Sequence, residues 1–302
     1  MKHLLGIADL SVDEIEDLLS RAQHYADGLA KGKSYQKLDN KIVLMLFFEP
    51  STRTVISFDM AAKRLGAEVI NWQVENSSMT KNESFLDTIL TLNAMGPDAI
   101  VIRHTEYGAP GFVASRAGCP VINGGDSWRE HPTQALLDAL TIRQMKGTLE
   151  GLTVSICGDV AHSRVASSNA ILLSKMGAKV RIIAPEFLMP EKFPVASVET
   201  FTELEEGLPG SDVVMMLRIQ KERMQQSNIP DDITYHNKYG LTAERLVLAK
   251  KDAIVMHPGP MNRNVEISDE VADDPKRSVI QRQVTNGVAT RMAVLDALIG
   301  GK

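Results

Sequence analysis

Short apolar runs alternate along the chain with longer segments in which apolar residues follow a helical period. The runs predict strands at residues 41–48, 68–72, 99–102, 121–123, 153–157, 179–184, 212–217 and 253–256. Apolar runs of this length, separated by helices, are typical of parallel strands that are buried on both faces.

The first helix is predicted to begin after Ser11, because Ser11 and Glu14 have the spacing of a capping box. Further helices are expected at 54–65, 84–94, 111–117, 131–145, 163–176 and 284–298. The alternation forms two blocks joined around residues 133–150. The sequence therefore predicts an α/β fold of two domains, each with a parallel sheet flanked by helices.

Unusual polar residues collect where the predicted strands end. They are Arg53, Arg103 with His104, His131, Arg164, Arg218 and His257. Scattered surface charges would not favour the same end of so many strands, and this end is where ligands bind in α/β folds. We therefore expect one site lined by several arginines.

The motif Ser51-Thr52-Arg53-Thr54 lies between the first predicted strand and a helix. Free N–H groups and the positive end of the helix dipole favour an anion there. The hydroxyls and the planar fork of Arg53 add donors suited to a phosphate or a carboxylate. A capped surface helix with a solvated arginine is the alternative, and the motif alone does not separate the two.

Two histidine–proline motifs suggest further ligand contacts. His131-Pro132-Thr133-Gln134 places a proline at a first helical position, and its histidine can polarise a ligand carbonyl or merely cap the helix. His257-Pro258-Gly259-Pro260 can present backbone carbonyls to a ligand N–H₂ group or form only a rigid turn.

Arg164 and Arg218 lie in the second block, where each can clamp a carboxylate. The alternative is an exposed charged surface, which we favour for Lys221 and Glu222. Lys81 lies in a polar loop, where a lysine is usually exposed to solvent.

The composition restricts the class of protein. The 302 residues are 44% hydrophobic and 24% charged, as in ordinary soluble globular proteins. A net charge of −5 argues against nucleic-acid binding, so an anion site must come from a local arginine cluster. No apolar run is long enough to span a membrane and the start does not fit a signal peptide, so we expect a cytoplasmic location. Cys119 and Cys157 are expected to be reduced core residues.

Motifs of several other enzyme classes are missing. The sequence has no G-x-G-x-x-G, Walker lysine, paired C-x-x-C, H-E-x-x-H or G-x-S-x-G motif. We therefore expect neither a cofactor nor a metal, and a chemistry that rests on positioning and electrostatic stabilisation.

The motifs at 51–54, 131–134 and 257–260, in this order and spacing, resemble those of the carbamoyltransferases over essentially the whole chain. Ser78, Lys81 and Glu83, together with the segments 162–164 and 217–223, resemble the aspartate-using branch. The resemblance implies transfer of the carbamoyl group of carbamoyl phosphate to L-aspartate, which gives N-carbamoyl-L-aspartate and phosphate in pyrimidine biosynthesis. It also implies a carbamoyl-phosphate-binding domain at 1–135, with a helix at 286–302 packed back on it, and an aspartate-binding domain at 148–285.

Motif matching also implies roles for single residues. The phosphate would be held by Ser51, Thr52, Arg53 and Thr54. Arg103 would bridge the phosphate and the carbonyl oxygen, and His131 would polarise that carbonyl. The carbamoyl amide would be held by Gln134 and the carbonyls of Gly259 and Pro260. The aspartate would be held by Lys81, Arg164, Arg218 and Gln220. The catalytic residues would be Arg53, Thr54, Lys81, Arg103 and His131.

The resemblance implies a homotrimer with shared sites, because in the family the loop that carries Ser77 or Ser78 and Lys81 reaches a neighbouring subunit. It leaves open whether a regulatory chain or another enzyme of the pathway associates with the trimer. We also expect the domains to close on the substrates, with Glu49 pairing with Arg164 or Arg223.

Val55 and Asp59 stand where the family commonly has arginine and glutamate, and we expect only a tuning effect. The nearest alternative is a carbamoyltransferase that acts on ornithine, although such enzymes typically carry H-C-L-P where this chain has His257-Pro258-Gly259-Pro260. A non-catalytic α/β protein that binds a small anion or an amino acid is a second alternative, and it would not need His131. An NAD-dependent dehydrogenase ranks last, since the fingerprint glycines are absent.

Overall fold

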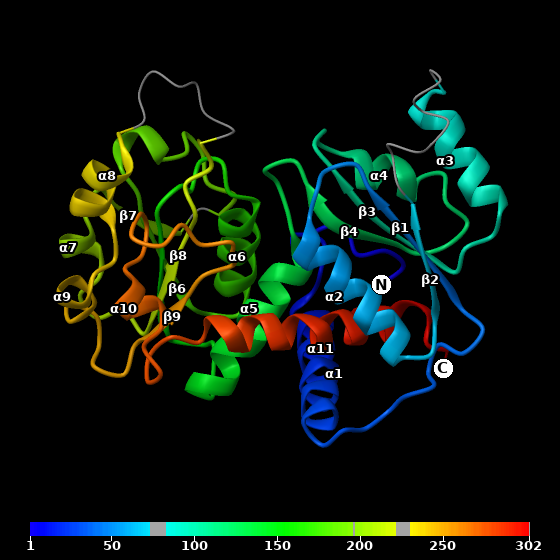
Figure 1. Cartoon of the computed structure of the whole chain (residues 1–302), viewed down its shortest axis with the longest axis horizontal. Coiled ribbons are helices and arrows are strands. Elements are labelled where there is room, and N and C mark those ends of the chain that lie inside the picture. Colours follow the sequence, from blue (N-terminus) through cyan, green and yellow to red (C-terminus); the bar gives the residue numbers. More distant parts are fainter. Residues whose placement is uncertain (73–82, 196, 222–229, 302) are drawn as a thin grey trace. The chain divides into compact units, whose positions relative to one another are not determined.

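The computed structural model describes residues 1–72, 83–195, 197–221 and 230–301. The chain divides into two compact units, Met1–Leu140 with Thr285–Lys302, and Thr141–Val284. Each unit is built on one parallel sheet with helices packed around it (Figure 1). The predicted fold class is therefore confirmed.

The sheet of the first unit has the strand order β2-β1-β3-β4. The strands are β1 (Ile42–Phe47), β2 (Glu68–Trp72), β3 (Ala99–His104) and β4 (Val121–Asp126), and all neighbours pair in parallel. The chain passes from β1 to one side of the sheet and then returns to β3 on the other. The carboxyl ends of β1 and β3 therefore form the switch point at which ligands bind in such sheets.

Helices of the first unit are α1 (Val12–Ala30), α2 (Thr52–Arg64), α3 (Phe85–Ala94), α4 (Ala109–Ala114), the start of α5 (Pro132–Lys146) and most of α11 (Ile280–Ile299). The capping box of α1 is present, since Glu14 N donates to Ser11 Oγ at 3.1 Å and Ser11 N to Glu14 Oε2 at 3.0 Å. The C-terminal helix returns to α1, where Arg21 Nη1 lies 3.2 Å from Asp296 Oδ2.

The sheet of the second unit has the order β7-β6-β5-β8-β9. Its strands are β5 (Thr153–Cys157), β6 (Lys179–Ile183), β7 (Val198–Phe201), β8 (Val213–Met216) and β9 (Ile254–Met256), again all parallel. Its helices include α6 (Arg164–Lys175), α7 (Leu204–Gly207), α8 (Asp232–Tyr239), α9 (Ala243–Leu246) and α10 (Asp269–Ala272). Here the switch point lies between the ends of β5 and β8.

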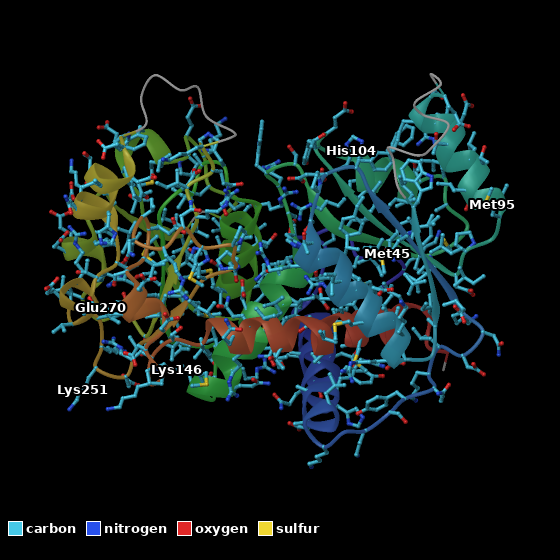
Figure 2. The ribbon with its side chains drawn as sticks, viewed as in Figure 1. Met45, Met95, His104, Lys146, Lys251 and Glu270 are labelled. Atoms are coloured by element: carbon cyan, nitrogen blue, oxygen red, sulfur yellow. The ribbon has the colours of Figure 1, made fainter. Side chains whose placement is uncertain are left out.

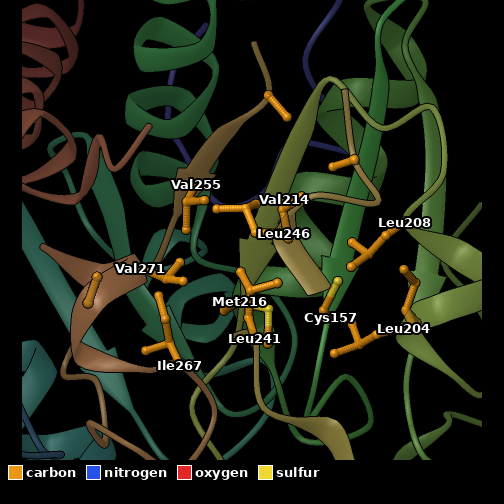
Figure 3. Close-up of a cluster of buried hydrophobic side chains, with 14 of the residues drawn as sticks. Cys157, Leu204, Leu208, Val214, Met216, Leu241, Leu246, Val255, Ile267 and Val271 are labelled. Carbon is orange, nitrogen blue, oxygen red and sulfur yellow. The ribbon is translucent and has the colours of Figure 1, made fainter. Parts of the chain in front are cut away.

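Both sheets are buried against apolar side chains. Figure 3 shows the cluster of the second unit, in which Cys157, Val214, Met216 and Val255 from three neighbouring strands meet Ile267. Cys119 belongs to the corresponding cluster of the first unit. Both cysteines are unbridged, and burial raises the pKa of each thiol. The prediction that they are reduced core residues is confirmed.

Methionines illustrate the contrast between core and surface. Met45 lies buried on the central strand β1, whereas Met95, just after α3, is exposed (Figure 2). Within the described part of the chain, no helix is both long enough and apolar enough to cross a membrane.

The predicted strands are all found, but β3 and β4 extend further, to His104 and Asp126. The sequence pattern misses β7, whose two central residues, Glu199 and Thr200, are exposed, so that the strand lacks an apolar run. It also misses α8, which is polar and begins at its cap, Asp231. The helix expected at 111–117 is found at Ala109–Ala114 instead.

Candidate active site

The turn 51–54 lies between β1 and α2, at the switch point of the first unit's sheet. Ser51 is the N-cap of α2, and its carbonyl accepts from Val55 N at 3.1 Å. Among the described residues, its hydroxyl makes no capping hydrogen bond. Thr52 and Arg53 are exposed, whereas Thr54 is buried. The turn thus presents backbone N–H groups, hydroxyls and a guanidinium at one helix end, which is an arrangement that binds phosphate.

Arg103, the last residue but one of β3, lies beside this turn. The register pairs Phe47 with Arg103, and Phe48 N donates to the Arg103 carbonyl at 2.9 Å. Arg103 Nε lies 3.2 Å from Glu49 Oε2, and Arg103 Nη1 donates to the Gly124 carbonyl at 3.5 Å. The structure therefore places Arg103 at the turn, as the sequence predicts. Glu49 pairs with the guanidinium of Arg103.

The pairing of Glu49 with Arg164 or Arg223 stays a prediction, and Arg223 lies outside the described residues. Within the first unit Glu49 pairs with Arg103. The one signal for this role in the sequence is that Glu49 is a carboxylate next to the anion-binding residues 51–54.

His104, the neighbour of Arg103, is a packing residue. Its ring centroid lies 4.8 Å from that of Phe48 and 5.2 Å from that of Phe85, and its Nδ1 accepts from Glu106 N at 2.9 Å. Burial lowers the pKa of His104, so the neutral ring suits this aromatic setting. Not every polar residue at a strand end belongs to the candidate site.

The connection from β4 to α5 sets the position of His131. Arg103 pairs with Gly125 and His104 with Asp126, so the end of β4 lies beside that of β3. His131 is buried, precedes Pro132 at the start of α5, and its carbonyl accepts from Gln134 N at 2.9 Å. The predicted helix start at this motif is confirmed.

Glu130 fixes the loop directly in front of His131. Its φ of 83° lies in the left-handed region, which costs a non-glycine residue about 1 kcal/mol. Its carboxylate accepts from Ile7 N at 2.7 Å, and its carbonyl accepts from Asp126 N at 3.1 Å. Glu130 thereby connects the loop to the N-terminal segment. The only hint of this role in the sequence is the position of Glu130 directly before the motif 131–134.

In the second unit, the buried Asp159 joins two loops at the switch point. Its Oδ1 lies 2.8 Å from His162 Nδ1, and its Oδ2 accepts from Gln220 N at 3.0 Å. Gln220 Nε2 in turn donates to the His162 carbonyl at 2.8 Å. Gly158 permits this approach, since its φ is 110° and a Cβ there would lie 2.8 Å from the Leu217 carbonyl oxygen. No motif in the sequence singles out Asp159, and it was not predicted as a site residue.

Arg164 and Arg218 lie on these two loops. Arg164 is the first residue of α6 and is buried, while Arg218 follows β8 and is half-buried. The strands before them are neighbours, with Cys157 opposite Met216 and Leu217 N donating to the Cys157 carbonyl at 2.8 Å. The structure therefore brings Arg164, Arg218 and Gln220 to the same sheet edge.

The turn after β9 is held by Glu266, a buried hydrogen-bond partner of His257. His257 Nε2 lies 3.0 Å from Glu266 Oε1, and His257 Nδ1 accepts from Gly259 N at 2.8 Å. The Gly259–Pro260 peptide bond is cis. Since Nδ1 accepts, Nε2 carries the proton and donates to the carboxylate, which fixes the ring and the start of the turn.

Three further residues of the predicted site fall outside the residues that the structure describes. Ser77, Ser78 and Lys81 belong to residues that the structure does not describe. In the described ranges, no group of three or more His, Cys, Asp and Glu side chains is placed to hold a metal ion.

Comparisons with known proteins agree on one family. Residues 2–144 match the model of the aspartate/ornithine carbamoyltransferase carbamoyl-P binding domain, and residues 150–298 match that of the Asp/Orn binding domain. The chain belongs to the aspartate/ornithine carbamoyltransferase family.

Relatives and solved structures of this carbamoyltransferase family cover nearly the whole chain. The aspartate carbamoyltransferase catalytic subunit of Rhodospirillum rubrum is 55% identical over 99% of this chain and 94% of the relative. Aspartate transcarbamoylase from Trypanosoma cruzi in complex with carbamoyl aspartate and phosphate superposes with a TM-score of 0.91 at 34% identity, over 99% of this chain and 96% of that one. Ornithine carbamoyltransferase from Pyrococcus furiosus gives a TM-score of 0.90 at 29% identity, over 100% and 98%.

Val55 and Asp59 depart from the pattern we expect in carbamoyltransferases. Asp59 Oδ2 accepts from Lys63 Nζ at 3.0 Å, one turn further along α2. Asp59 therefore has a cationic partner although Val55 supplies none, and the tuning effect stays a prediction.

Proposed function

We propose that the chain is an aspartate carbamoyltransferase. It transfers the carbamoyl group of carbamoyl phosphate to the amine of L-aspartate, which gives N-carbamoyl-L-aspartate and phosphate, a step of pyrimidine biosynthesis. The observation that carries the proposal is the pair of switch points, one with the phosphate-type turn 51–54 beside Arg103 and the other with Arg164 and Arg218. The 54–55% identity to catalytic subunits with this name supports it.

In the proposed reaction the first unit binds carbamoyl phosphate. Residues 51–54 hold the phosphate, and Arg103 bridges the phosphate and the carbonyl oxygen. The aspartate amine attacks the carbonyl carbon, and His131 donates a hydrogen bond to the oxygen that gains negative charge. The C–O bond to phosphate then breaks, phosphate leaves with the electron pair, and the proton lost by the amine ends on phosphate.

The second unit binds aspartate in this proposal. A dicarboxylate needs two cationic partners, and Arg164 and Arg218 offer two planar guanidinium groups at one sheet edge. Gln220 and Lys81 complete the proposed aspartate contacts, and the carbonyls of Gly259 and Pro260 join Gln134 on the carbamoyl amide. Ornithine, which carries a second amine instead of a second carboxylate, would leave one arginine without a partner.

The test is an assay of ureido product with carbamoyl phosphate and a panel of amino acids. The proposal expects product with L-aspartate and not with L-ornithine, together with release of phosphate that depends on aspartate. Product with ornithine alone would assign the chain to the other branch of the family. No product with any amino acid would favour a non-catalytic binding protein.

We further propose a cytoplasmic homotrimer with shared active sites. Support comes from apolar side chains that the first unit leaves exposed, namely Ile56 and Met60 on α2 and Ile70 on the edge strand β2. An apolar surface of this kind is typical of a protein contact. Sedimentation should give three times the mass of 33.1 kDa, and a monomer at assay concentration would contradict the shared sites.

A further inference from the structure

Gln134 contacts a buried carboxylate in the first unit. Gln134 lies in the first turn of α5, and its Nε2 donates to Asp138 Oδ1, one turn later, at 3.0 Å. The Asp138 side chain is fully buried. Arg291 on α11 is buried as well and attracts the Asp138 carboxylate. The guanidinium carbon of Arg291 lies 5.1 Å from the ring centroid of Phe58 on α2.

The charge of Asp138 depends on Arg291. A buried carboxylate is stable as an anion only when a cation and hydrogen bonds compensate for its lost hydration. Burial lowers the pKa of Arg291, the Asp138 charge opposes this effect and the Arg103 charge adds to it, and together they give a pKa of about 9. Arg291 therefore carries its proton at neutral pH, and Asp138 has the compensating cation that it needs.

An ionised carboxylate only accepts hydrogen bonds, whereas a glutamine amide has one donor end and one acceptor end. Asp138 therefore binds the NH₂ end of Gln134, since the opposite orientation would bring two oxygens together. The Gln134 carbonyl oxygen is thereby the end that remains for a ligand, and it accepts from an N–H₂ group. An acyl phosphate with a methyl group in this place has no hydrogen to donate.

We propose that Asp138, whose charge Arg291 compensates, is a positioning residue that orients the Gln134 amide so that the site selects a carbamoyl over an acetyl group. The proposal rests on the proposed function, because that function places Gln134 on the carbamoyl amide. Asp138 acts through Gln134 and touches no substrate. A site built around a substrate N–H rejects an analogue without it strongly, because the analogue leaves a buried acceptor unpaired.

The test compares carbamoyl phosphate with acetyl phosphate, which differ at this group. The readout is the ratio of the inhibition constant of acetyl phosphate to the KM of carbamoyl phosphate at saturating aspartate, measured for the wild-type protein and for each variant. Asp138→Asn can donate to the Gln134 carbonyl and so permits the flipped amide. We expect this variant to lower the ratio by about tenfold or more, whereas a merely structural role would weaken both acyl phosphates equally.

Two further variants show whether the effect passes through Gln134. Gln134→Met should lose the discrimination, and adding Asp138→Asn to it should change the ratio no further. The matched control is Asp296→Asn, another aspartate-to-asparagine change in the same unit. Asp296 pairs with Arg21 and not with Gln134, so this variant should leave the ratio unchanged. Additive effects of Asp138→Asn and Gln134→Met would overturn the proposal.

Asp138→Asn leaves Arg291 buried without its anion and can fail to fold for that reason. The double variant Asp138→Asn with Arg291→Gln removes both charges together, and it should fold and also lose discrimination. Retention of the wild-type ratio in this double variant contradicts the inference alone. A wild-type protein that does not prefer carbamoyl phosphate contradicts the proposed function, and the inference with it.

Discussion

In the first unit, the polar groups at the switch point come chiefly from one helix N-terminus, whereas in the second unit they come from side chains on two loops. Residues 51–54 supply backbone N–H groups and hydroxyls, and Arg53 is exposed there. In the second unit Arg164 is buried, and the buried Asp159 joins the two loops. The carboxyl ends of the strands thus carry different kinds of polar groups in the two sheets.

The difference follows from the shapes of the proposed ligands. A phosphate has oxygens on every side and is matched by a cluster of N–H donors that point toward one spot. Two carboxylates at the ends of a short amino acid need two forks held at a fixed separation. A fixed separation requires a rigid connection between the loops, and Asp159 with Gln220 provides it. Mutations at the anion-binding side chains should therefore affect one substrate only: carbamoyl phosphate for Arg53 in the first unit, and aspartate for Arg164 and Arg218 in the second.

The largest effect is expected for Arg53→Ala in the first unit. The variant loses the guanidinium next to the phosphate, so kcat should fall by at least about 10²-fold. Folding should be unaffected because Arg53 is exposed. Steady-state kinetics with a thermal melt would check both points, and near-normal turnover would refute the phosphate assignment of the turn.

Arg218→Ala tests the second unit in the same way. Loss of one carboxylate clamp should raise the KM for aspartate by about 10- to 100-fold. The KM for carbamoyl phosphate should stay near that of the wild-type protein. Lys221→Ala, three residues later on an exposed ion pair with Asp232, is the matched control and should leave both values unchanged. A rise in the KM for carbamoyl phosphate of similar size would contradict the division between the units.

Asp159→Asn is expected to have a smaller effect of the same kind. In the wild-type protein one carboxylate oxygen accepts from Gln220 N and the other lies beside His162 Nδ1. The asparagine keeps the shape of the side chain but replaces one of these oxygens by an NH₂ donor. One loop contact is lost, and the KM for aspartate should rise by about tenfold. If KM does not change although the melting temperature falls, Asp159 supports the fold and not the spacing of the arginines.

Val55→Arg should have the smallest effect. An arginine at position 55 lies one helical turn before Asp59, which now pairs with Lys63. A second ion pair four residues apart on an exposed helix surface stabilises the helix by about 0.2–0.5 kcal/mol. Denaturant unfolding should therefore show a slight gain in stability with kcat within about twofold, and a tenfold change in kcat would give Val55 a role beyond tuning.

Much of the fold is legible in the sequence because parallel strands need apolar residues on both faces. The runs that become β1, β5 and β8 lie in central positions and meet this requirement. The edge strand β7 has polar residues at its centre and was not predicted. Periodicity detects runs of apolar residues, and β7 has none, whereas the exposed edge strand β2 keeps Val69, Ile70 and Trp72 and was predicted.

The candidate site was predicted only as far as its motifs. Arg103, Arg164 and Arg218 stand out because they follow apolar runs. Glu49, Glu130 and Asp159 act through contacts with residues far away along the chain, such as that of Glu130 with Ile7. Sequence spacing does not report such contacts, since they depend on which strands become neighbours.

The most direct test of the division between the units is equilibrium binding of carbamoyl phosphate alone, measured by titration calorimetry on the wild-type protein, Arg53→Ala and Arg218→Ala. The account predicts that Arg218→Ala binds within about twofold of wild type and that Arg53→Ala binds at least about 10²-fold more weakly. Equal weakening in both variants, or wild-type affinity in Arg53→Ala, would contradict it.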